Sequence, residues 1–177
     1  MSFPYGTVPV LYWNGVEIGQ SVAIARFLAR KFGLAGRDDT EAAQVDDIVY
    51  ALQDALNEGF ETFLKTRDEI VGVLKFLGLA IPHDNDEEKK KRMMERHLNV
   101  TIPTVLGQLE KLLKKRGGKF LVGNAWTWAD IQTFFFCSQL VDKEVIKKFP
   151  GVNELVRRVG EIPNIKEWME TRPNNPF

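Results

Sequence analysis

The thiol of Cys137, the single cysteine of this sequence, could act as a nucleophile. A thiol becomes reactive when a nearby base or positive charge favours the thiolate. His83 and His97 are the only histidines, and the sequence gives no reason to place either beside Cys137. Cys137 ends the apolar run FFFC, which is typical of a small buried side chain. We therefore interpret it as a core residue, and a single cysteine also excludes an internal disulfide.

A run of charges, residues 87–92 (EEKKKR), could in principle contact a polyanion. It places acids before bases, the order that a helix dipole favours, and it contains no interleaved aromatic residue. Lys and Arg number 24, equal to Asp and Glu at 24, so the chain has no net charge. This balance predicts a solvated helix face, and neither nucleic acid nor a membrane surface is the expected partner. With no apolar run near the ~20 residues of a membrane span and no visible signal peptide, we expect a cytoplasmic protein.

Thr127 and Asp130 stand three residues apart at the start of an apolar helical pattern. A hydroxyl at this spacing from a carboxylate predicts a capping box, in which the Asp130 carboxylate accepts the backbone N–H of Thr127. Trp126 precedes the cap, where a hydrophobic staple residue belongs. We interpret both capping residues as structural.

Two kinds of element must position these groups. Residues 8–13 and 16–18 are β-prone and flank Asn14-Gly15, a hairpin turn signal, although Pro9 fits only an edge or a bend. Apolar periodicity predicts helices beyond the hairpin, with Ser21 and Thr40 as N-caps and a kink at Pro103. Those helices cover residues 21–31, 41–64, 87–116, 127–141, 152–162 and 164–171. The fold class is therefore mainly α, with residues 68–86 left unclear.

Four segments together resemble the cytosolic glutathione transferases, most closely the sigma class, which includes haematopoietic prostaglandin D synthases. They are residues 3–11 (FPYGTVPVL), 19–28 (GQSVAIARFL), 124–130 (NAWTWAD), and 162–166 (IPNIK) with 171–173 (TRP). The resemblance implies an all-helical C-terminal domain, residues 40–177, preceded by a partial thioredoxin-like glutathione-binding domain, residues 1–33. In the family a strand–helix–strand segment with the catalytic tyrosine precedes the hairpin. We expect that segment to be missing here, which would impair activity, and we assign no catalytic residue.

The resemblance also implies the ligand contacts. Val8-Pro9 matches the family's cis-proline, where the Val8 backbone pairs with glutathione like an added strand. Gln20 and Ser21 match the Gln-Ser pair that holds the γ-glutamyl portion at a helix start. Asp54 matches an acid that reaches across a dimer to the amino group of glutathione, although a solvated acid is an equal interpretation.

Three further expectations concern the second substrate and the metal. The acceptor pocket could include Phe60, Phe63 and Phe177, with core packing the preferred interpretation of the first two. Tyr50 and Gln53 occupy positions where prostaglandin D synthases carry metal-binding aspartates, so no metal is expected. The stretch 68–86 could be a lid or an insertion.

We expect glutathione conjugation or isomerisation of hydrophobic electrophiles, in a homodimer or other oligomer. The open strand edge of the hairpin supports association. The alternative is a non-catalytic scaffold or dimerisation module built on the same helical domain.

Overall fold

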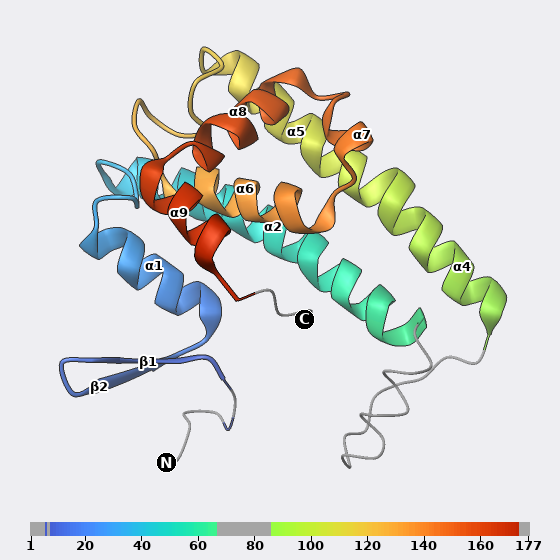
Figure 1. Cartoon of the computed structure of the whole chain (residues 1–177), viewed down its shortest axis with the longest axis horizontal. Coiled ribbons are helices and arrows are strands. Elements are labelled where there is room, and N and C mark those ends of the chain that lie inside the picture. Colours follow the sequence, from blue (N-terminus) through green and yellow to red (C-terminus); the bar gives the residue numbers. More distant parts are fainter. Residues whose placement is uncertain (1–5, 7, 67–85, 174–177) are drawn as a thin grey trace.

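The computed structural model describes residues 6, 8–66 and 86–173, with only the backbone of residues 61 and 63–66. A small hairpin and one helix lie at one end, and longer helices pack beside them (Figure 1). The mainly α fold class is confirmed. In chain order the elements are β1 (Val10–Trp13), β2 (Val16–Gly19), α1 (Ser21–Lys31), α2 (Asp39–Thr66), α4 (Glu87–Arg96), the π-helical η2 (His97–Thr101), α5 (Ile102–Lys115), α6 (Trp128–Leu140), α7 (Lys143–Ile146), α8 (Pro150–Gly160) and α9 (Pro163–Thr171).

The hairpin forms as predicted, with an antiparallel register that pairs Trp13 with Val16. Asn14 and Gly15 have φ angles of 48° and 81°. Positive φ at both central residues is what a two-residue turn of the hairpin type needs. The ring of Trp13 meets Phe27 of α1 edge-on, 5.5 Å between centroids, so the hairpin packs on that helix.

Two helix starts differ from the prediction. Ser21 is the first helical residue, not the cap, and Gln20 occupies the cap position with a φ of 69° and no side-chain capping bond. For α2 the cap is Asp38, whose Oδ1 accepts the N–H of Glu41 at 2.8 Å. Thr40 therefore lies inside the helix. Sequence periodicity predicts the presence of a helix well. It predicts the first residue poorly, because several neighbouring polar residues can serve as the N-cap.

In place of the kink predicted at Pro103, the structure has a π-helical turn just before that residue. Helix α4 passes through the π-helical η2, where the N–H of Ile102 donates to the carbonyl of His97, five residues back. Pro103 has no N–H to donate to the carbonyl four residues before it. The wider turn absorbs this loss, and α4, η2 and α5 run as one long rod (Figure 1).

Helix α6 forms the centre of the packing, and it contacts α1, α2 and α8. Its apolar residues lie all round its circumference, a pattern typical of a buried helix. Phe136 and Cys137 of α6 are buried with residues such as Leu52 of α2 and Leu155 of α8. The prediction for Cys137 is confirmed.

The short helix α7 was not predicted. Its four residues are too few for a periodic signal, and its cap, the Asp142 carboxylate that accepts the N–H of Glu144 at 2.7 Å, is the only local cue. Among the described residues, no helix has the length and apolar character to cross a membrane.

Candidate functional site

A cavity of about 400 Å³ lies where the start of α1 meets α2 and α6. Helix α1 contributes polar Ser21 and two small apolar side chains. None of the lining side chains is charged. They are Ser21, Val22 and Ala25 from α1, Val49, Gln53 and Leu56 from α2, and Trp128, Gln132 and Phe135 from α6.

The start of α1 brings backbone N–H groups and the Ser21 hydroxyl to the cavity. The first N–H groups of a helix have no partner within the helix, and the dipole adds a partial positive charge. The chain turns into the helix through Gln20, whose carbonyl accepts the N–H of Ile24 at 2.9 Å. Gln20 and Ser21 are both exposed, so the arrangement can receive an anionic group from solvent.

The hairpin register brings a second backbone segment to the same place. Val10 pairs with Gly19, so the residues before Val10 lie at the end of the hairpin where Gln20 and Ser21 follow. Paired strands lie about 4.8 Å apart. The Val8–Pro9 peptide bond is cis, as predicted. Val8 is 72% exposed, which leaves its backbone accessible to a ligand.

Asp54 lies on α2 but does not line the cavity. It is exposed on the outer side of the helix, whereas its neighbour Gln53 turns toward Ser21. Within one chain the structure therefore does not bring Asp54 together with the other predicted site residues.

An ion pair fixes the position of α1 against α2. Arg26 donates from Nε to Asp46 Oδ1 at 2.9 Å and from Nη2 to the Tyr50 hydroxyl at 3.1 Å. The guanidinium also lies 5.4 Å from the centre of the Tyr50 ring. Both hydrogen bonds raise the pKa of Arg26, which keeps it charged. This contact holds the start of α1 beside the α2 face that carries Gln53.

The capping box forms and places Trp128 in the cavity wall. The Asp130 carboxylate accepts the N–H of Thr127 at 2.8 Å and the Thr127 hydroxyl at 2.9 Å. A third donor, the N–H of Leu121, comes from the preceding loop at 2.9 Å. Burial raises the pKa of Asp130, and these hydrogen bonds partly oppose that rise.

Trp128 follows the cap, and its side chain is only 6% exposed. Its indole Nε1 is buried and has no acceptor within the part of the chain that the structure describes. Sequence reasoning missed Trp128, Gln132 and Phe135 as site residues, because only the meeting of three helices brings them to Ser21.

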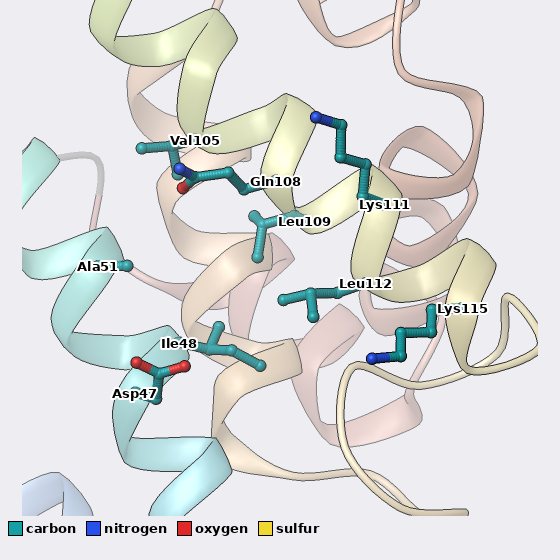
Figure 2. Close-up of a pocket in the computed structure, with 9 residues that line it drawn as sticks. All are labelled: Asp47, Ile48, Ala51, Val105, Gln108, Leu109, Lys111, Leu112 and Lys115. Carbon is teal, nitrogen blue, oxygen red and sulfur yellow. The ribbon is translucent and has the colours of Figure 1, made fainter.

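A second groove, of about 380 Å³, separates α2 from α5 (Figure 2). Ile48, Leu109 and Leu112 form its apolar floor, and Asp47 faces Lys115 across it (Figure 2). It shares no lining residue with the first cavity and contains none of the predicted site residues.

The core interpretation of Phe60 is wrong, because the residue is 62% exposed. Phe60 lines neither of these two hollows, and its place in an acceptor pocket stays a prediction. The side chain of Phe63, the residue Phe177 and the stretch 68–85 lie outside the described residues.

Two other reactive groups lie away from the cavity lining. Burial raises the pKa of the Cys137 thiol to about 12, which disfavours a thiolate. Burial also lowers the pKa of His97, opposed by the charge of Glu58. In the described ranges, no three His, Cys, Asp or Glu side chains gather in a group that could hold a metal ion.

The family model "Glutathione S-transferase, C-terminal domain" matches residues 75–172. Glutathione S-transferase 3 of Caenorhabditis elegans is 32% identical over 178 residues, covering 99% of this chain and 79% of the relative. The solved prostaglandin synthase D of Nilaparvata lugens superimposes with a TM-score of 0.76 at 29% identity, covering 98% of this chain and 78% of that one.

A third similar protein, the monomeric Na-GST-3 of the hookworm Necator americanus, superimposes with a TM-score of 0.73 at 31% identity. That match covers 99% of this chain and 78% of the hookworm chain. Sequence and fold agree over almost the whole chain, and the chain belongs to the glutathione S-transferase family.

Proposed function

We propose that this chain binds reduced glutathione at the start of α1 and either joins it, through its sulfur, to a hydrophobic electrophile or uses it to isomerise one. One observation carries the proposal: an apolar, uncharged cavity opens directly beside Ser21 at a helix N-terminus. An anionic peptide and an apolar partner could therefore lie side by side.

The start of α1 suits the γ-glutamyl end of the tripeptide. Its carboxylate can accept hydrogen bonds from the unpaired N–H groups of the first turn and from the Ser21 hydroxyl. The Gln20 amide, exposed beside it, can bind the same portion. The dipole of a helix N-terminus stabilises a bound anion more strongly when few neighbouring charges screen it. No charged residue lines this cavity.

The Val8 backbone suits the middle of the tripeptide. An extended peptide can add to the free backbone next to β1 as a further strand would, with Pro9 fixing the direction of the chain there. Together Val8, Pro9, Gln20 and Ser21 would hold glutathione along one line, from the hairpin to α1.

The apolar side chains of the cavity would then hold the electrophile. Val49, Leu56 and Phe135 offer an apolar surface without a charge, which favours a partner of low polarity. A neutral, dry surrounding also strengthens every interaction with a sulfur anion held at its edge.

We further propose that this protein is similar to the sigma class and acts as a dimer in which Asp54 reaches the partner's glutathione. The likeness to an insect prostaglandin synthase D supports the class. The exposure of Asp54 on the outer side of α2 supports its role toward a second subunit.

Calorimetric titration of the full chain with reduced glutathione tests the site. We expect Ser21→Ala and Gln20→Ala each to weaken binding roughly tenfold, since each removes a hydrogen bond to a charged group. Ser138→Ala on α6 is the matched control, because Ser138 is exposed and lies outside the cavity lining. Absence of binding heat in the wild type, or equal binding by all variants, would refute the proposed site.

Turnover of a generic aromatic electrophile separates the enzyme from the non-catalytic alternative. Binding with turnover supports a transferase, whereas binding without turnover supports a glutathione-binding module. A chain that does neither would leave the scaffold or dimerisation module as its function.

A further inference from the structure

We infer that Gln132 is a specificity-determining residue, whose side-chain amide donates a hydrogen bond to the carbonyl oxygen of an α,β-unsaturated aldehyde or ketone in the cavity beside Ser21. This inference rests on the proposed function, because it names the class of electrophile that the same cavity would take. The donor can be measured without glutathione, so the inference and the proposed function can fail separately.

Gln132 lies in the middle of the α6 face that forms one wall of the cavity. Trp128, Gln132 and Phe135 stand at positions i, i+4 and i+7, the spacing that brings side chains to one face of a helix. All three line the cavity. The Nε1 atom of Trp128 is buried, whereas the Gln132 side chain is half-buried. Gln132 is therefore the polar group that this wall offers to a ligand.

The amide of Gln132 has no partner within the described part of the chain, although its nitrogen and oxygen are not sealed from solvent. The second amide of the lining, Gln53, already donates from Nε2 to Asn57 Oδ1 at 3.0 Å. Of these two amides, Gln132 is thus the one with both N–H bonds available. A ligand in the cavity can accept one of them without breaking a hydrogen bond within the protein.

The remaining lining sets the polarity of the ligand. Most of the other lining side chains are apolar, among them Val22, Val49 and Leu56, and none is charged. A charged ligand would lose its hydration here without meeting a countercharge, whereas a neutral group loses less. A hydrogen bond is also stronger where little water competes for it. The cavity therefore favours a neutral, largely apolar electrophile that carries one acceptor oxygen.

Addition of a thiolate to an α,β-unsaturated carbonyl compound makes use of such a donor. The sulfur bonds to the β-carbon, the carbon–carbon π bond breaks, and its electron pair moves to the carbonyl oxygen to give an enolate. The α-carbon then takes up a proton, which balances the one that the thiol released. A hydrogen bond from Gln132 strengthens as the oxygen gains charge, so it stabilises the transition state more than the bound substrate.

Two apolar electrophiles separate this donor from general binding in assays of the full chain with glutathione. Benzylideneacetone is an enone, whereas benzyl chloride reacts by loss of chloride and develops no charge on oxygen. Gln132→Met keeps the side-chain length without the donor, and it should lower kcat/KM roughly tenfold for the enone and less than about twofold for benzyl chloride. Gln108→Met is the control, because Gln108 is exposed on α5 outside this cavity. An unchanged value for the enone, or equal losses with both substrates, would overturn the inference.

Binding without glutathione gives a second readout, which decides the donor role even for a chain without turnover. Benzylacetone is the saturated ketone, and butylbenzene has a similar skeleton without the oxygen. In an amide proton–nitrogen NMR spectrum, the ketone and not the hydrocarbon should shift downfield the side-chain signals that Gln132→Met removes. The ketone should also bind roughly 2- to 10-fold more tightly than the hydrocarbon, the range of one neutral hydrogen bond, and only when Gln132 is present.

The two proposals are then distinguishable. If those amide signals do not respond selectively to the ketone, the inference is refuted, even where glutathione binds as proposed. If the chain binds no glutathione but the selective shift is present, the proposed function fails while Gln132 stands as the donor of the cavity.

Discussion

Asp130 makes one hydrogen bond that its capping pattern predicts and one that the pattern does not predict. Its position three residues after Thr127 predicts the capping bond, which is local. The bond from Leu121 N–H is not local, since that residue belongs to a loop nine positions earlier. Asp130 is fully buried, so its carboxylate joins a loop to the central helix in addition to capping it.

We predict that Asp130→Ala lowers the free energy of unfolding by about 3 kcal/mol or more, because it leaves the N–H groups of Leu121 and Thr127 buried without an acceptor. A cap alone would account for ~0.5–2 kcal/mol. Chemical denaturation measures the difference. Asp142→Ala is the control, since Asp142 caps the exposed start of α7 with a single bond. Equal losses in the two variants would contradict the joining role.

The free energy of unfolding that is lost in Asp130→Ala should depend on pH. Burial raises the folded-state pKa of Asp130 above its unfolded value, so the folded state holds the proton more tightly. The stabilisation is fully present below the unfolded pKa and is lost as the pH rises through the raised folded pKa. The cost of Asp130→Ala should therefore be larger near pH 4 than near pH 7, and a pH-independent cost would argue against the raised pKa.

At the scale of elements, the neighbouring side chains decide whether a glycine inside a helix can be replaced by alanine, as Gly59 and Gly107 show. A side-chain carbon at Gly59 of α2 would lie 2.7 Å from His97 Nε2, whereas one at Gly107 of α5 would lie 3.7 Å from Phe149. The first distance is a clash and the second is an ordinary contact. Gly59 thus permits the close approach of α2 to the π-helical turn.

We predict that Gly107→Ala stabilises the fold by up to ~1 kcal/mol, the gain in helix propensity. Gly59→Ala should lose that gain and destabilise the fold by about 1–3 kcal/mol, as overpacking does. Thermal melts of the two variants against the wild type measure this contrast. A stabilised Gly59→Ala would show that His97 moves aside freely.

The sequence predicts an element well where its apolar pattern repeats over several turns. It predicts poorly those helix ends and turns whose conformation depends on tertiary contacts. The presence of helices over residues 21–31 and from Glu87, and the Asn14-Gly15 turn, follow from local preferences, although Gln20 and not Ser21 is the cap of the first. The start of α2 at Asp39 and the π-helical η2 depend on competing caps and on packing, which one sequence does not reveal. The cavity lining is missed for the same reason, because Gln53 and Trp128 are 75 residues apart by their numbers and meet only in the fold.

At the scale of the whole molecule, the hairpin differs from the rest of the surface. In the described residues the sheet has two strands, so each strand has one unpaired edge. One face of the hairpin packs on α1 through Trp13, and Tyr12 is exposed on the other. An open edge beside exposed apolar side chains favours pairing with another chain.

We therefore predict that the protein self-associates at micromolar concentration, and sedimentation equilibrium measures the mass of the species present. Tyr12→Lys places a charge on the exposed face of the edge strand and should shift the equilibrium toward monomer. Trp168→Lys on α9 is the matched control, since it removes an exposed aromatic residue far along the chain from the hairpin. If both variants weaken association equally, general surface hydrophobicity and not the strand edge is the cause. If the wild type sediments as a monomer across the whole range, the hairpin edge does not drive assembly, and Asp54 has no partner subunit to reach.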